Sequence, residues 1–228
     1  MNLTRTVSFL LLASAAALPA AEKNRQRLED AVMVMEEIMG VADRAIPQSL
    51  LDRAHCVTVI PGLKKGAFIF GARYGKGYIT CRRAGGAGWS APATVRVEGG
   101  SFGLQAGATE TDVVMLVMNE SGARKLMQSK FTLGAGVAAA AGPVGRTANA
   151  ETDAQLRAEI LTYSRSRGLF AGAALQGGTL RPDLDANKAM YGSRLITKEI
   201  VEDPKIEPTK AGADLIAVLN KYSSRPSK

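Results

Sequence analysis

The sequence predicts an α+β fold, in which N-terminal helices pack on a twisted, glycine-rich antiparallel sheet that can close into a barrel or a sandwich. Two patterns carry this prediction. Apolar side chains first recur with helical spacing, and after residue 55 they give way to short runs of β-branched and aromatic residues separated by glycine. An apolar content of 46% with 22% charged residues is typical of a globular chain, and the length suits one buried core.

Residues 1–21 are predicted to be a secretory signal peptide. Arg5 precedes an apolar run, residues 7–17, which is shorter than a membrane span and ends in small residues. Ala17 and Ala20 each suit the position before a cleavage point, so that point stays open. We therefore expect a periplasmic or secreted protein, which can also attach peripherally to a membrane.

The first element of the mature chain is expected to be an amphipathic helix over residues 24–39. Leu28, Met35 and Ile38 share one helical face, and Gly40 ends the pattern. The opposite face mixes both signs of charge, which is typical of a solvated helix rather than of one that lies on a membrane. A second, short helix is predicted at 47–54.

Strands joined by tight turns are predicted to follow, near 55–60, 66–74, 77–83, 91–98, 101–108 and 112–118. The turns are placed at the glycine-containing breaks 61–62, 75–77, 85–88 and 99–100, because glycine adopts positive φ without steric cost. The remaining predicted elements are a helix at 120–128, strands near 131–144, 156–166 and 169–180, and helices at 186–191 and 211–222. Residues 22–194 are assigned to a single domain and residues 195–228 to a C-terminal extension.

No catalytic, metal or cofactor site is predicted. Ser101 stands in a GxSxG pattern, but the flanking residues alternate as in a strand, whereas a nucleophile elbow needs a strand-to-helix turn. The single histidine, His55, precedes this serine instead of following it. The chain has no CxxC, no HExxH and no phosphate-binding glycine loop, so neither a metal nor a nucleotide is expected.

Two cysteines and one tryptophan leave alternatives open. Cys56 and Cys81 would meet an oxidising compartment after export, where they could form a disulfide or remain two buried thiols. Trp89 could be an anchor at a membrane interface or a packing residue of the core.

Positive charge is concentrated in one stretch of the chain. Residues 53–97 contain no Asp or Glu, and they carry eight cationic side chains against a net charge of +8 for the whole chain. Such a block gives the fold a positive side that would attract phosphates, anionic lipid or an acidic protein, unless it is only a solvated basic face. Nucleic acid is not expected as a partner, because aromatic residues for base stacking make up only 5% of the chain.

Five segments occur in register over about 150 residues and together resemble the SYLF, or Ysc84-like, family. They are PG at 61–62 with GAFIFGARYGKG at 66–77, WSAPA at 89–93, GSFGLQAG at 100–107, GPVGRT at 142–147 and YSRSRGLFAG at 163–172. The resemblance covers nearly everything after residue 25. It implies binding to lipid or to an actin surface rather than catalysis.

The expected function is that of an exported, non-enzymatic lipid-binding module that docks on anionic, phosphoinositide-like phospholipid headgroups. The alternative is a protein-interaction module of the actin-binding type. The candidate contacts are the cations Lys64, Lys65, Arg73, Lys76, Arg82, Arg83, Arg146, Arg165 and Arg167. On a strand, Arg165 and Arg167 would project from one face as a phosphate-sized pair, unless they form salt bridges with Glu151, Asp153 or Glu159.

Overall fold

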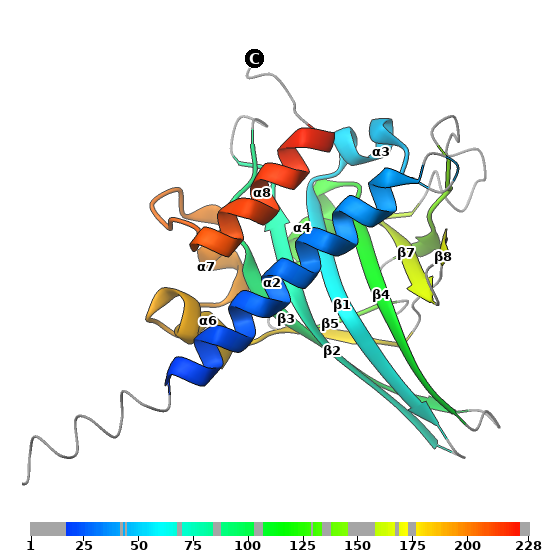
Figure 1. Cartoon of the computed structure of the whole chain (residues 1–228), viewed down its shortest axis with the longest axis horizontal. Helices are drawn as coiled ribbons and strands as arrows, with labels where there is room; N and C mark the ends of the chain where they lie inside the picture. Colours follow the sequence, from blue (N-terminus) through cyan, green and yellow to red (C-terminus); the bar gives the residue numbers. More distant parts are fainter. Residues whose placement is uncertain are drawn as a thin grey trace, which may run out of the picture.

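The chain forms a curled β-sheet with helices against both of its faces (Figure 1). The computed structural model describes residues 17–41, 43, 45–67, 70–83, 88–102, 107–128, 130–133, 138–145, 158–166, 169–172 and 177–223. The expected α+β class is confirmed.

The strands of the sheet have the order β5-β9-β3-β2-β1-β4-β7-β6, and β8 pairs with β7. Their bounds are β1 Cys56–Ala67, β2 Phe70–Cys81, β3 Ala93–Phe102, β4 Gly107–Val117, β5 Phe131–Thr132, β6 Ala139–Ala141, β7 Ile160–Ser166, β8 Leu169–Gly172 and β9 Thr179–Pro182. The pairs are antiparallel as expected, except for β6 and β7, which are parallel. The sheet curls into a half-barrel, because its strands do not close into a ring among the described residues.

The helices are α2 Ala17–Gly40, α3 Gln48–Arg53, α4 Glu120–Leu126, α6 Leu184–Tyr191, α7 Thr197–Glu202 and α8 Lys210–Tyr222. Helices α2 and α8 lie side by side on one face of the sheet (Figure 1). Their apolar stripes pack on alternate strand residues, and Leu28, Met35 and Leu219 are at most 1% exposed. The other strand residues face the inside of the curl, where a second core includes Ile79, Val95 and Met115 and extends to α4 and α7.

The first helix is longer than its apolar pattern predicts, since α2 begins at Ala17 rather than at residue 24. Residues 17–21 of the expected signal peptide are therefore helical, and residues 1–16 lie outside the described part of the chain. Helix α7 was not predicted at all. Helix α8 contributes Leu215 and Leu219 to the same core as α2, so the segment after residue 195 packs on the rest of the fold.

The predicted turn at 75–77 is wrong, because these residues lie inside β2. A Cβ at Gly77 would stand 2.1 Å from the carbonyl oxygen of Val59, and one at Gly75 would stand 2.7 Å from Cδ1 of Leu63. The two glycines therefore allow β2 to approach β1 closely. Likewise, the predicted break at 99–100 is continuous strand within β3.

The predicted turn at 61–62 is also wrong, because it is a bulge inside β1. The register against both neighbouring strands shifts around Gly62, whose φ is +59°. The Gly62 N–H donates to Oδ1 of Asp112 at 2.9 Å. A bulge re-aims a strand without ending it, so β1 continues to Ala67.

Cys56 and Cys81 form a disulfide, which settles the alternative that the sequence left open. The two residues are direct partners in the β1–β2 register, at the end of the hairpin farthest from Ala67. The disulfide therefore ties the two longest strands together at one end.

Candidate functional site

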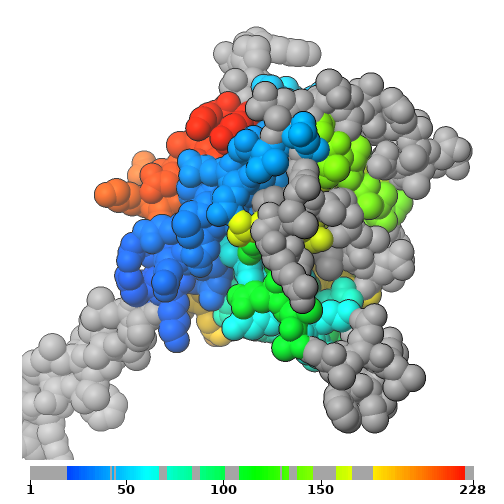
Figure 2. Space-filling model, turned by 45° about the vertical axis from the view of Figure 1, so that its right-hand side comes forward, coloured from blue at the N-terminus to red at the C-terminus, as the bar shows by residue number. Residues whose placement is uncertain are grey.

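The candidate surface is the outer half of the β1–β2 hairpin, beyond the bulge at Gly62. These strands extend past the helical layer (Figure 1), and their outer ends emerge beyond α2 in the space-filling view (Figure 2). The register places Lys65 directly opposite Arg73 and Lys64 opposite Tyr74. The hairpin thus brings together three of the predicted cations.

The two cross-strand pairs lie on opposite faces of the sheet, since side chains alternate along a strand. Lys64 shares its face with Glu110, its partner on β4, and Tyr74 with Glu98, its partner on β3. Lys65 and Arg73 are instead flanked by Thr109 and Gly99 at the matching positions. The face that carries Lys65 and Arg73 is therefore the more positive of the two.

Two glycines leave room for the stem of Arg73. A Cβ at Gly99 would lie 3.3 Å from Cγ of Arg73, and one at Gly178 would lie 4.0 Å from its Cδ. The stem of Arg73 thus runs over bare backbone, and the residue is half-buried. Glycine at these positions therefore accommodates a long cationic side chain in addition to allowing close strand packing.

Lys76 is half-buried and pairs with a buried carboxylate. Its Nζ lies 2.5 Å from Oδ2 of Asp183, a carboxylate whose side chain is only 2% exposed and which caps α6 by accepting from the Ala186 N–H. Burial by itself would raise the pKa of Asp183, but Lys76 and the Ala186 N–H outweigh it and hold that pKa below the usual value. Lys76 therefore stabilises the junction of β2 and α6.

Arg82 and Arg83 lie at the disulfide end of the hairpin, apart from the other cations. The Arg82 guanidinium stacks 3.8 Å from the centroid of the Trp89 ring and donates to the Ser223 carbonyl oxygen at 2.9 Å. Arg83 Nε donates to the Trp89 carbonyl oxygen at 3.0 Å. Trp89 is 1% exposed and is thus the core residue that one of the two alternatives expected.

Arg165 also makes internal ion pairs, but with partners that the sequence did not indicate. Its Nη2 lies 2.5 Å from Oδ2 of Asp112, its register partner on β4, and its Nη1 pairs with Glu37 of α2. Glu159 pairs with Lys125 instead, at 3.0 Å. Arg146 and Arg167 lie outside the described residues, so the expected pair of Arg165 and Arg167 cannot be placed.

Tyr74 is the surface residue that sequence reasoning missed. Its side chain is 48% exposed, an unusual position for a large aromatic ring. The signal was present as alternation along residues 70–78, but the assumed turn at 75–77 concealed that these residues form one strand.

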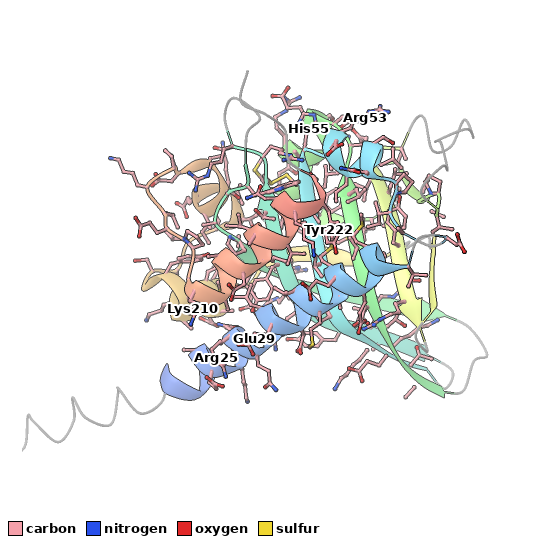
Figure 3. All side chains as sticks on the ribbon, turned by 45° about the horizontal axis from the view of Figure 1, so that its top comes forward. Arg25, Glu29, Arg53, His55, Lys210 and Tyr222 are labelled. Carbon is pink, nitrogen blue, oxygen red and sulfur yellow. A yellow bond between two sulfur atoms is a disulfide. The ribbon has the colours of Figure 1, made fainter. Side chains whose placement is uncertain are left out.

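The residues considered for catalysis do not form a nucleophile elbow. Ser101 lies within β3, paired with Gly71 of β2, where the elbow would need a strand-to-helix turn. His55 is exposed next to Arg53 at the disulfide end of the sheet (Figure 3). Among the described residues, no three His, Cys, Asp or Glu side chains gather as metal ligands, and no helix is long and apolar enough to cross a membrane.

Comparison with known proteins gives consistent matches. Residues 98–222 match a family model described as Ysc84, Las17-binding protein actin regulator. The chain is 32% identical over 216 residues to LAS seventeen-binding protein 3 of Saccharomyces cerevisiae, which covers 92% of this chain and 46% of that protein. It is 34% identical over 181 residues to Protein YSC84 of the same yeast, covering 78% and 38%, and 29% identical over 215 residues to SH3 domain-containing YSC84-like protein 1 of Xenopus laevis, covering 91% and 63%. The chain thus spans less than half the length of the two yeast relatives.

Proposed function

This chain belongs to the Ysc84 family, and from that membership we propose that it is a non-catalytic binding module that docks on an acidic protein surface through Lys65 and Arg73. The family description names actin regulation, so actin filaments are the acidic surface to test. Because export is also proposed, the protein would meet actin only where it reaches a host cell. The basic residues at the other end of the hairpin contribute to the fold rather than to this contact.

The observation that carries the proposal is the direct opposition of Lys65 and Arg73. Like charges facing each other across a strand pair destabilise a sheet by some tenths of a kcal/mol, and the matching positions on the outer strands are Thr109 and Gly99, which carry no charge. Two neighbouring cations attract an acidic surface more strongly than a single surface cation does.

The neighbouring aromatic ring favours a protein as the partner. Exposed tyrosine is enriched at the centres of protein interfaces, where it supplies contact area at low entropic cost. Tyr74 follows Arg73 in β2 but lies on the opposite face of the sheet, beside its register partner Lys64, so a protein that covers both faces of the outer hairpin would meet this ring as well as the cationic pair.

The test is cosedimentation of the full chain with actin filaments, and separately with vesicles of neutral or anionic phospholipid. Lys65→Glu/Arg73→Glu should weaken filament binding by about tenfold, and added salt should weaken wild-type binding, because the screening length shortens. Lys188→Glu/Lys210→Glu makes the same change of charge at exposed helix positions and should leave binding intact. Binding to anionic vesicles alone would replace the protein partner with a lipid one, and equal loss in both variants would assign the effect to net charge.

We also propose that the protein is exported. The disulfide supports this proposal independently of the leader-like residues at the N-terminus, since structural disulfides persist in oxidising compartments. Expression of the full chain in bacteria with fractionation should place a shortened, oxidised form outside the cytoplasm. A full-length, reduced form that stays in the cytoplasm would contradict export without affecting the binding proposal.

A further inference from the structure

A cavity lies at the disulfide end of the sheet, away from the outer hairpin. Its volume is about 670 Å³, within the range of small-molecule sites. Cys56 and Lys65 are nine positions apart on β1, so this cavity and the cationic pair are separated by roughly 30 Å. The two surfaces can therefore be tested separately.

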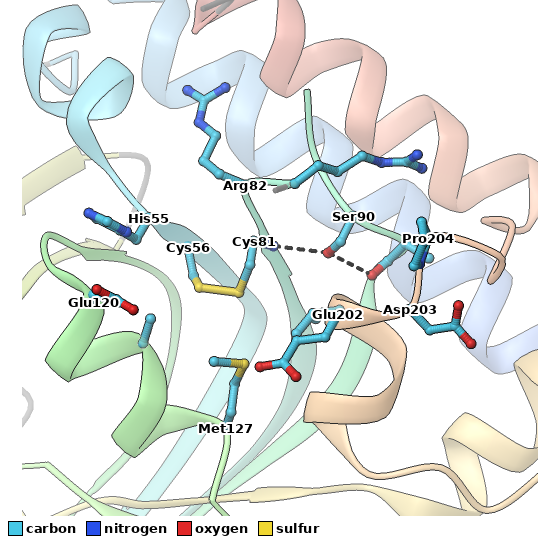
Figure 4. Close-up of a pocket in the computed structure, with 14 residues that line it drawn as sticks. His55, Cys56, Cys81, Arg82, Ser90, Glu120, Met127, Glu202, Asp203 and Pro204 are labelled. Carbon is cyan, nitrogen blue, oxygen red and sulfur yellow. Dashed lines mark hydrogen bonds between the residues drawn. A yellow bond between two sulfur atoms is a disulfide. The ribbon is translucent and has the colours of Figure 1, made fainter. Parts of the chain in front are cut away.

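The floor of the cavity is apolar. Figure 4 shows the Cys56–Cys81 disulfide at its centre with Met127 beside it, and Ala91, Ala123 and Val201 also line the cavity. The two cysteines are 1% and 6% exposed, so the cavity is the route by which a molecule can reach the sulfur atoms. A ligand with an apolar body would gain binding free energy by burying apolar surface against this floor.

The rim of the cavity is acidic. Glu120 of α4 and Glu202 of α7 stand on two sides, and Asp203 follows Glu202. Figure 4 shows the Glu202 carboxylate turned toward Met127, over the floor. The two glutamates pair with exposed side chains one helical turn away, Arg124 at 3.0 Å and Lys198 at 3.9 Å, and such pairs contribute little. A ligand cation can thus replace these partners at low cost.

The two arginines that line the cavity make hydrogen bonds to other parts of the protein. Arg82 donates to Ser223 and Leu51 and stacks on Trp89. Arg83 donates to the Trp89 carbonyl oxygen. Three carboxylates, those of Glu120, Glu202 and Asp203, therefore line the cavity beside two arginines, and the carboxylates are the groups that would meet a cationic ligand.

We propose that this cavity binds a small organic cation that carries a protonated primary amine on an apolar body. No Phe, Tyr or Trp stands among its described lining residues, so it lacks the aromatic cage that recognises a quaternary ammonium. Carboxylates accept hydrogen bonds, which a primary ammonium can donate and a quaternary ammonium cannot. The site therefore selects for N–H donors as well as for charge.

The test is calorimetric titration of the full, oxidised chain with three probes of equal chain length: n-hexylammonium, n-hexyltrimethylammonium and n-hexanol. The first should bind at least fivefold more tightly than either of the others. It should also slow the reduction of the disulfide by dithiothreitol, followed by thiol labelling of Cys56 and Cys81, because an occupied cavity blocks the approach to the sulfur atoms. Equal affinity for the three probes, or reduction at an unchanged rate at saturation, would overturn the proposal.

Two variants locate the binding. Glu202→Gln should weaken the binding of n-hexylammonium by about two- to fivefold, as expected for an exposed charge pair. Glu207→Gln, outside the cavity, should leave this binding unchanged. Ala123→Leu fills the floor of the cavity and should lower the affinity for all three probes at least tenfold. Ala213→Leu, on the exposed side of α8, should leave these affinities unchanged. If Ala123→Leu fails to fold, the affinity of Glu202→Gln and the protection of the disulfide still test whether the probe binds in this cavity. Unchanged binding in Glu202→Gln would contradict the assigned site.

Discussion

Arg165 Nε lies 2.6 Å from Oδ2 of Asp112, the residue directly opposite it on the neighbouring strand. The same arginine also pairs with Glu37 of α2, and Asp112 accepts from the N–H of Gly62. One ion pair therefore links the bulge in β1, the strands β4 and β7, and the long helix that covers them.

Arg165→Leu should destabilise the protein by about 2 kcal/mol, because it leaves the Asp112 carboxylate partly buried without its main partner. Adding Asp112→Asn should recover part of the loss, since the amide oxygen can still accept from Gly62. Urea unfolding of the two variants measures both effects. If Arg165→Leu is as stable as wild type and instead loses ligand binding, Arg165 is a contact residue and the structural role assigned to it is wrong.

Asp183 should make the stability depend on pH at acidic values. Its pKa is lower in the folded protein than in the unfolded chain, so its contribution is complete above the unfolded pKa and is lost as pH falls through the folded one. Asp183→Asn keeps a capping oxygen for α6 but should cost about 1–2 kcal/mol at pH 7, because it removes the charge that Lys76 faces. The difference from wild type should shrink as pH is lowered from about 5 toward 2.

Unfolding curves at several pH values, compared with Asp185→Asn on the exposed side of α6, check this prediction. A constant difference across that range would show that Asp183→Asn perturbs the fold for a reason other than charge.

Removal of the disulfide should lower the free energy of unfolding by about 3.5 kcal/mol, the value that the loop-closure model gives for a bond that spans 25 residues. Thermal unfolding of Cys56→Ala/Cys81→Ala beside the oxidised wild type measures this loss of stability. Thiol labelling of the native, unreduced protein is the companion measurement, and two reactive thiols there would refute the bond itself.

Arg82 and its neighbour Arg83 should respond differently to substitution. Arg82→Ala removes the stacking on Trp89 and the contacts to Ser223, so we expect a loss of about 2 kcal/mol and faster hydrogen exchange at the end of α8. Arg83→Ala, at an exposed position with one bond to the Trp89 backbone, should cost less than about 1 kcal/mol. Similar exchange at α8 in both variants would argue against the anchoring role of Arg82.

Local patterns determined much of the fold. The helical spacing around Leu28, Met35 and Ile38 correctly predicted a buried face of α2, and α8 was predicted to within one residue at each end. The glycines misled prediction because glycine has two uses. At a turn it supplies positive φ, and within a sheet it removes a Cβ where strands approach closely, as Gly77 does against Val59. The sequence does not distinguish these cases, because the obstructing atom belongs to a distant residue.

The residues of the candidate site likewise separate into what composition predicts and what long-range packing sets. The sequence by itself determined that residues 53–97 are positive and free of acids, since this is a property of composition. Only the tertiary structure decided what each cation meets. Asp183, Asp112 and Ser223 come from far along the chain and meet Lys76, Arg165 and Arg82, whereas Lys65 lies opposite Arg73 on the side of the sheet that faces the inside of the curl. A side chain's partner depends on strand register and on the path of the chain between elements, and these are set by packing across the whole core.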